Sequence, residues 1–337
     1  MIRKLSVPVA LMTLSMSAMA QSSVTIFGII DEAATYYQAG SQHSAALVSN
    51  GMVPSRFGFI GREDLGSGYA AGFWLENGFS PNNGTLKTAN TLFDRRSTVS
   101  LFTPYGELRL GRDMTPTYLA DWTYDPFWDT GLGGFAASSP TPSEPGNQAP
   151  TTGARTSNGI SYLLPDNRFG INAHITVSTS NGDQTNRYVG GSLGYSGGPL
   201  SVLGSWSQTY TEPDRYRYMT LGGSYTFGPL VVMVRGNTKE LGNAKFINFG
   251  FGGTYKVGFG SIRAAVTFNR GRGSESGHQA NMYALGYSYS LSKRTTLYGQ
   301  VAYLDNMGKQ ASSLYGGPAV EPGMETSGIQ LGILHRF

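Results

Sequence analysis

Apolar and polar residues alternate along most of the chain. In the segment from Ser23 to Tyr36, Val24 and Ile26 share one parity, while Thr25 and Asp31 occupy the other. A repeat of two residues is typical of a β-strand with one apolar and one polar face, whereas an α-helix repeats its apolar positions every 3.6 residues. The alternation recurs to the end of the chain without helical periodicity, so the pattern predicts an all-β protein.

About sixteen alternating segments can be counted, and short turns alternate with longer polar connections between them. The short turns are rich in Gly, Pro, Asn and Ser, which favour tight reversals of the chain. The longer connections are expected at 38–50, 81–90, 113–154, 180–185, 210–214, 238–243, 271–279 and 307–325. An even number of strands joined in this way puts both termini on the side of the short turns, as in membrane-spanning β-barrels.

The polar parity of the strands decides between two β architectures. A soluble β-sandwich needs large apolar residues on its inner face. Here the second parity is filled by Gly, Ser, Thr, Arg, Glu and Gln, which can line water but cannot form a dry core. The pattern therefore favours a 16-stranded antiparallel transmembrane β-barrel, with apolar residues toward lipid and polar residues toward an aqueous interior.

The N-terminus has the features of an export signal. Arg3 and Lys4 provide a positive start, the run from Leu5 to Met16 is apolar, and Ala18 to Ala20 has the small-residue spacing of a cleavage site. This predicts a secretory signal peptide over 1–20. An uncleaved membrane anchor is the alternative, but the apolar run is only about twelve residues, against ~20 for a membrane-spanning helix.

Cleavage between Ala20 and Gln21 leaves one barrel domain over 21–337. The full chain has a net charge of +4, and loss of Arg3 and Lys4 leaves about +2. That is too little for a nucleic-acid-binding surface, so no nucleic-acid partner is expected. The absence of cysteine excludes an extracellular scaffold held by disulfides. The 47 glycines and 20 tyrosines suit a membrane barrel.

One segment interrupts the alternation for about forty residues, between Arg112 and Arg155. It is rich in Asp, Trp and Phe from Asp121 to Phe135 and then contains four prolines. A connection of this length inside a compact domain is uncommon unless it is functional. In the order of the chain it is the third long connection, over about 113–154.

Several motifs along the mature chain, beginning with Ser55–Gly66 (SRFGFIGREDLG), resemble those of the Gram-negative general-diffusion porins, especially the group common in beta-proteobacteria. Five further stretches carry the resemblance in the same order: Ser23–Asp31, Gly106–Arg112, Arg155–Tyr162, Leu291–Tyr298 and His335–Phe337. The resemblance spans the whole mature chain, and it is the six motifs together rather than any one of them that make it specific.

The resemblance implies a sixteen-stranded barrel of the outer membrane, usually a homotrimer with one pore in each subunit. It implies passive diffusion of small hydrophilic solutes and ions through a water-filled channel. The third outer loop folds inward and narrows the pore, with acidic side chains that face basic ones on the wall. The partners that follow are outer-membrane lipids, lipopolysaccharide and the barrel-assembly machinery.

Five arginines are candidates for the basic side of the constriction. The resemblance indicates Arg56, Arg112 and Arg155, and strand parity adds Arg96 and Arg109. Arg56 and Arg155 also have the parity of the aqueous face. Arg112 has the parity of the lipid face, so it can reach the pore only if a bulge or strand end at the preceding glycine, position 111, changes its direction.

Three aspartates of the third loop, Asp121, Asp125 and Asp129, match the acidic side of the constriction by resemblance. Their motif departs from the commonest form of the family, which leaves open which of them faces the opening. Asp125 precedes Pro126 and could instead form an ordinary turn. The terminal aromatic residue, Phe337, is expected in the interfacial girdle of the last strand.

Opposed arginines and aspartates would orient polar solutes and give weak charge selectivity, with an anion preference if the arginines outnumber the acids at the narrowest point. We considered three alternatives: a substrate-specific channel, a non-conducting adhesive or structural barrel, and a barrel hydrolase. The four histidines lack metal-ligand spacing, and there is neither a nucleophile elbow nor a phosphate loop. We therefore expect no enzyme activity, no cofactor and no metal.

Overall fold

The computed structural model describes residues 23–149, 152–179 and 186–337. The expected signal peptide, its cleavage site at Ala20 and Gln21, and the expected connection at 180–185 lie outside the described residues.

The described residues form a closed antiparallel barrel of sixteen strands, as the alternation predicts. The strand β1 (Ser23–Ala39) pairs along one edge with both β2 (Gln42–Ser49) and β3 (Arg56–Gly66), which are two halves of one barrel strand. The short β5 (Thr85–Leu86) pairs with β4 outside the main sheet. The other barrel strands are β4 (Tyr69–Ser80), β6 (Arg96–Thr103), β7 (Gly106–Met114), β8 (Arg155–Leu163), β9 (Ile171–Ser178), β10 (Tyr188–Gly197), β11 (Leu200–Tyr210), β12 (Arg215–Phe227), β13 (Leu230–Leu241), β14 (Ala244–Val257), β15 (Gly260–Gly273), β16 (His278–Ser290), β17 (Thr295–Gly308) and β18 (Thr326–Arg336).

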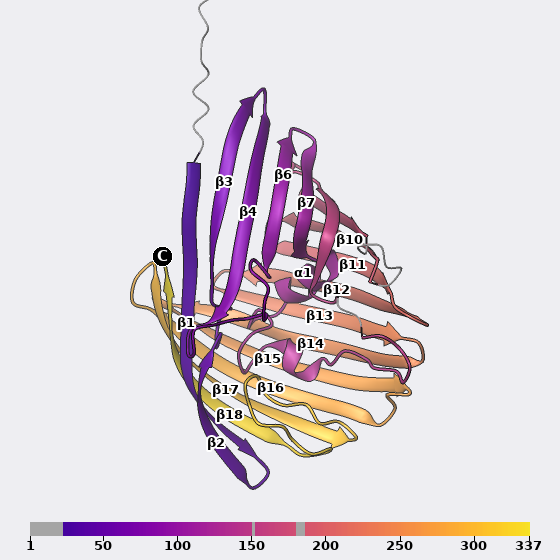
Figure 1. Ribbon diagram of the computed structural model, residues 1–337. Helices are drawn as coiled ribbons and strands as arrows, with labels where there is room; N and C mark the ends of the chain where they lie inside the picture. The colour runs from indigo at the N-terminus through magenta and orange to yellow at the C-terminus, as the bar shows by residue number, and fades with distance from the viewer. Residues whose placement is uncertain (1–22, 150–151, 180–185) are drawn as a thin grey trace, which may run out of the picture.

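The barrel closes where the first strand meets the last. The free edge of β1 pairs with β18, from Ile29 opposite Arg336 to Ala39 opposite Thr326 (Figure 1). Beyond this ladder, the backbone amides of Gly28 and Phe337 each donate to the carbonyl oxygen of the other, at 3.0 and 3.1 Å. Closure matters because an unpaired strand edge cannot satisfy its backbone groups in lipid.

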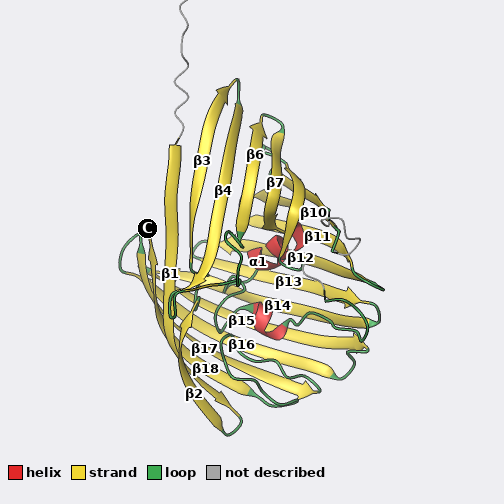
Figure 2. Cartoon of the chain, in the orientation of Figure 1, coloured by secondary structure: helices red, strands yellow, loops and turns green. Residues whose placement is uncertain are grey.

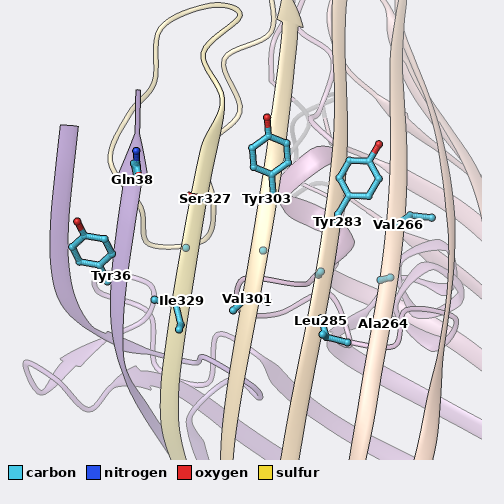
Figure 3. A pocket seen from close by; sticks show the side chains of 14 residues that line it. Tyr36, Gln38, Ala264, Val266, Tyr283, Leu285, Val301, Tyr303, Ser327 and Ile329 are labelled. Carbon is cyan, nitrogen blue, oxygen red and sulfur yellow. The ribbon is translucent and has the colours of Figure 1, made fainter. Parts of the chain in front are cut away.

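Alternation of the side chains separates the two faces of the sheet. On β14, Ile247, Phe249 and Phe251 are exposed on the outside, whereas Phe246 and Asn248, which have the other parity, are buried inside. Figure 3 looks onto the outward face over β1 and β15–β18, an apolar and shallowly hollowed surface. Tyr283 and Tyr303 lie side by side there, with ring centroids 6.5 Å apart. Such aromatic rings are typical of the membrane interface.

Three predicted long connections are wrong because the strands continue further than expected. Residues 38–50 form a hairpin in which β1 turns at Gly40 and returns as β2. Likewise β13 and β14 pair up to Leu241 and Ala244, and β15 and β16 are joined by residues 274–277 alone. In the extension of β13 and β14 the outward positions are polar, for example Glu240 opposite Lys245, so the apolar signal ends before the hydrogen-bond ladder does. The long connection before β18 is confirmed over 309–325.

The third loop connects β7 and β8 and begins at residue 115, two residues later than predicted. Its described residues, 115–149 and 152–154, run inside the barrel (Figure 1). It contains a helix that the sequence pattern did not predict, α1 (Pro116–Thr123), and the 3-10 turn η1 (Phe135–Ser138) (Figure 2). The helix lies against the inner face of β9–β12, and η1 against β15 and β16. The loop therefore follows one half of the barrel wall and leaves the opposite half, β3–β8, uncovered.

The irregularity expected at Gly111 in β7 is present. The pairing of β7 with β8 shifts register between Gly111 and Asp113, and Gly111 has a φ of +124°. A Cβ atom at this position would lie 2.1 Å from the carbonyl oxygen of Ser97. Only glycine fits this backbone.

We expect Gly111→Ala to separate β6 from β7 locally and to lower the free energy of unfolding by about 1–3 kcal/mol through overpacking. The matched control is Gly198→Ala, because Gly198 also has a positive φ but has open space around its Cβ position. Thermal unfolding in detergent compares the two variants. Equal melting temperatures would contradict the proposed clash.

Candidate functional site

Helix α1 starts with a local capping signal. The Thr115 side chain accepts a hydrogen bond from the Tyr118 amide at 3.3 Å, and Pro116 occupies the first turn. A threonine cap followed by proline is a favourable helix start, because both satisfy the geometry of the first turn. The helix is fixed at its other end by contacts with the wall.

Asp121 attaches the buried face of α1 to the wall. Its carboxylate forms an ion pair with Arg235 of β13, with 2.7 Å between Oδ1 and the guanidinium nitrogen. It also accepts hydrogen bonds from the Tyr218 hydroxyl at 2.6 Å and from the Asn237 amide at 2.8 Å. Both charged groups are almost inaccessible, and breaking one partner of such a pair typically costs 3–5 kcal/mol. This network sets the rotation of the helix.

Asp125 organises the next segment of the loop. Its two carboxylate oxygens accept hydrogen bonds from the backbone amides of Phe127, Asp129 and Phe135, each at 2.8 Å. The side chain is fully buried. Burial, and secondarily the charge of Asp129, raise the pKa of Asp125 to about 7, against the effect of its amide donors. Burial and the charge of Asp121 likewise raise the pKa of Asp129. The pair therefore carries less negative charge near neutral pH than two exposed aspartates would.

Apolar residues of the loop fill the space between it and the wall. Phe127, Leu132 and Phe135 are buried in one cluster with inward residues of β15–β17, among them Met282 and Leu304. The wall is built from small residues where the rings approach, since a Cβ at Gly250 or Gly286 would lie within 3 Å of a phenyl ring. The core of the molecule is thus inside the barrel, between loop and wall.

The tip of the loop contacts the irregular joint between β2 and β3. The Thr130 hydroxyl donates to the carbonyl oxygen of Met52 at 2.7 Å. Asp31 of β1 holds the same joint, because its carboxylate accepts from the amides of Met52 and Val53 at 2.8 and 2.6 Å. A Cβ at Gly131 would lie only 1.8 Å from the carbonyl oxygen of Gly51. The joint therefore limits how far the loop tip can extend across the barrel.

An opening of ≈ 320 Å³ remains between the loop and the uncovered wall. Five arginines and two carboxylates line it on the side of the wall, namely Arg56, Arg95, Arg96, Arg109, Arg155, Glu76 and Asp113. The loop and the β2–β3 joint supply the other side with Met52, Val53, Pro54, Tyr118, Leu119, Trp122, Trp128 and Thr130. Trp74, Met114, Leu163 and His174 complete the lining. All the charged groups are therefore on the side of the wall, and the side of the loop and joint is largely apolar and aromatic.

Ion pairs on the wall neutralise some of the arginines. Glu76 lies 2.6 Å from Arg95 and 3.6 Å from Arg56. Asp113 lies 2.6 Å from Arg109 and 3.5 Å from Arg96. Glu107 adds a further ion pair with Arg109, at 2.8 Å. These pairs hold the guanidinium groups in position, and the five arginines still outnumber the three carboxylates.

Arg155 differs from its neighbours because it forms no ion pair with any carboxylate in the described part of the chain. Its Nε donates to the carbonyl oxygen of Arg95 at 2.9 Å. Its hydrogen-bond acceptor is thus a neutral carbonyl group, and Arg155 borders the opening. An arginine keeps its charge at any relevant pH.

The predicted site residues divide into two groups. Arg56, Arg96, Arg109 and Arg155 line the opening, whereas Arg112 is absent from its lining and donates to the Asp94 carbonyl and the Ser157 hydroxyl at 2.6 and 2.8 Å. Asp113 has the inward parity of Arg109, with which it forms an ion pair four residues apart. The irregularity at position 111 is therefore present but does not bring Arg112 to the opening.

The expected row of acids facing the arginines is replaced by aromatic side chains. Asp121 and Asp125 lie on the side of the loop that faces away from the opening. Asp121 pairs with Arg235 on β13, and Asp125 accepts hydrogen bonds from loop amides. Asp129 is adjacent to Asp125 and is also absent from the lining. Phe337 closes the barrel beside Gly28 and remains half exposed on the outside.

Sequence reasoning missed three residues of this site: Arg95, Glu76 and Arg235. Glu76 has the polar parity of its strand and is directly opposite Arg96, a pairing that strand register would have indicated. Arg95 precedes β6, where no alternation marks it. Arg235 has no local signal, because its partner comes from a distant segment.

Comparison with known proteins agrees with this architecture. The family model described as Gram-negative porin matches residues 8–309. The chain belongs to the Gram-negative porin family. It is 37% identical to outer membrane porin protein 32 of Delftia acidovorans, over 99% of this chain and 100% of that protein. An outer membrane porin of Bordetella pertussis is 27% identical over 95% of this chain and 96% of its own length.

Solved porin structures show the same fold. The anion-selective porin from Comamonas acidovorans superposes with a TM-score of 0.83 at 33% identity, covering 94% of this chain and all of that one. A trimer form of OmpT from Vibrio cholerae, at 14% identity and a TM-score of 0.68 over 94% of this chain and 99% of its own, shares the fold. The protein is thus an outer membrane porin of the beta-proteobacterial type, and the family and fold point to a channel rather than an enzyme.

We expect Gly131→Ala to move the loop tip away from the β2–β3 joint, because the added methyl group would overlap the Gly51 carbonyl oxygen. Single-channel conductance should then differ from that of the wild-type protein. Gly146→Ala is the control, since Gly146 also has a positive φ in the same loop but no atom within 4 Å of its Cβ position. A conductance unchanged in both variants would show that this contact does not hold the loop.

Proposed function

We propose that this porin forms a water-filled channel for passive diffusion of small hydrophilic solutes and ions, with a preference for anions. The observation that carries the proposal is the charge of the opening, where five arginines meet only two carboxylates. A row of fixed positive charges in a narrow passage raises the local concentration of anions and opposes cations.

The loop strengthens this preference because none of its three candidate aspartates lines the opening. Asp121 is neutralised by Arg235, and Asp125 is turned toward its own backbone amides. Neither carboxylate lines the opening. The positive wall therefore lacks an opposing negative row, and the selectivity follows from the arginines alone.

The comparisons support the same direction. A structural neighbour at 33% identity carries the description anion-selective porin. For the assembly we propose a homotrimer with one pore per subunit, exported with a cleaved signal peptide and surrounded by outer-membrane lipid and lipopolysaccharide. The closed barrel has its own opening, which is consistent with independent pores, and one neighbour of the same fold is described in a trimer form.

Arg155 borders the opening without an ion-pair partner among the described residues. Arg155→Gln should lower the chloride-over-potassium permeability ratio by roughly two- to fivefold, because one unit charge at about 4 Å in water contributes about 1 kcal/mol. The reversal potential of a planar bilayer in a KCl gradient measures the ratio.

Arg112→Gln is the matched control, because Arg112 lies on the adjacent strand but does not line the opening. Its reversal potential should equal that of the wild-type protein. A wild-type channel that passes potassium as readily as chloride, or an unchanged ratio in Arg155→Gln, would contradict the proposed anion preference.

A further inference from the structure

The apolar side of the opening is formed by the orientation of α1. In α1 the residues buried against the wall are Pro116, Thr117, Ala120 and Asp121. Leu119 and Trp122, three positions apart, therefore share the other face and line the opening. The usual orientation of an amphipathic helix is therefore reversed: Asp121 is buried against the protein wall, and the Trp122 indole borders the aqueous opening.

Contacts with the wall and the joint extend this apolar surface. Trp128 lines the opening from the loop tip, and the guanidinium group of Arg263 lies 4.3 Å from the centroid of its ring. Met52, Val53 and Pro54 continue the surface from the joint that Asp31 holds. The surface is thus supported from behind and keeps its place in the open channel.

The arginines lie across the same opening of ≈ 320 Å³. That volume is within the range of small-molecule sites, about 300–1,000 Å³. Arg155 offers a guanidinium group without a carboxylate partner, and guanidinium groups bind planar carboxylates through paired hydrogen bonds. A solute in the opening can therefore place a negative group on one side and an apolar ring on the other.

We propose that the constriction is a binding site for amphipathic anions, with aromatic carboxylates as the preferred class. The carboxylate contacts the arginine wall at Arg155, and the ring lies against Trp122 and Leu119. The proposal rests on the anion preference proposed above and extends it from charge to shape. A small hydrophilic anion makes only the first contact, whereas an aromatic one makes both, and offset contact between two aromatic rings is favourable.

Binding at this site is compatible with passage. A channel solute must bind well enough to enter and weakly enough to leave. One guanidinium contact and one face of an indole, both open to water, provide this balance. An aromatic carboxylate should accordingly interrupt the chloride current briefly and also cross the membrane.

The test compares benzoate with acetate, which have the same charged group but differ in the ring. Each is added to wild-type channels in a planar bilayer with KCl, and the concentration that halves the chloride current is measured. We expect the half-blocking concentration of benzoate to be at least roughly threefold lower than that of acetate, in line with the contribution of an aromatic pair.

Two substitutions separate the two contacts. Trp122→Ala should raise the half-blocking concentration of benzoate to that of acetate, and Arg155→Gln should weaken both anions alike. The control is Trp206→Ala, because Trp206 lies on the outward face of β11 and should leave the difference intact. Each variant must first show open channels in KCl, which establishes that it has folded.

The outcomes distinguish the two proposals. Equal block by benzoate and acetate in channels that prefer chloride to potassium would overturn the aromatic site and leave the anion preference in place. A benzoate effect that persists in Trp122→Ala would also overturn it. Channels without chloride preference would instead overturn the proposed function on which the site rests.

Discussion

The ion pair between Asp121 and Arg235 determines how the loop meets the pore. It joins α1 to the wall strand β13 and is almost fully buried, and Tyr218 and Asn237 donate further hydrogen bonds to Asp121. A buried charge left without its partner is costly, so the helix cannot rotate without losing the pair. Because the pair fixes the rotation, it turns the acid of α1 toward the wall and the indole of Trp122 toward the solute.

The remaining features of the constriction follow from this orientation. The loop can lie flat because the inner wall offers small residues beneath its phenyl rings, and its tip stops against the β2–β3 joint. The opening is left beside β3–β8, where arginines are held by Glu76 and Asp113. The proposed charge selectivity comes from the wall, and the proposed contact with apolar groups comes from the loop.

The barrel could be predicted from sequence because its signal is local. Alternation within a strand reports the two faces of the sheet, and the break in alternation located the third loop. The extent of the strands beyond the apolar band was missed, since polar pairs such as Glu240 and Lys245 continue the ladder without an apolar signal. The irregularity expected at Gly111 is present, but Arg112 stays outside the lining of the opening, as its strand parity alone indicated.

The orientation of the loop could not be predicted in the same way. Asp121 and Arg235 are distant in sequence, and nothing near either residue indicates the other. The rotation of α1 therefore decides which residues face the solute, and cysteine accessibility measures this rotation directly in a cysteine-free chain. Under an anionic thiosulfonate reagent, channels with Leu119→Cys should lose current, whereas channels with Ala120→Cys, one position further along, should be unaffected. If the reagent instead reduces the current of channels with Ala120→Cys and leaves those with Leu119→Cys unaffected, the proposed rotation of α1 is wrong.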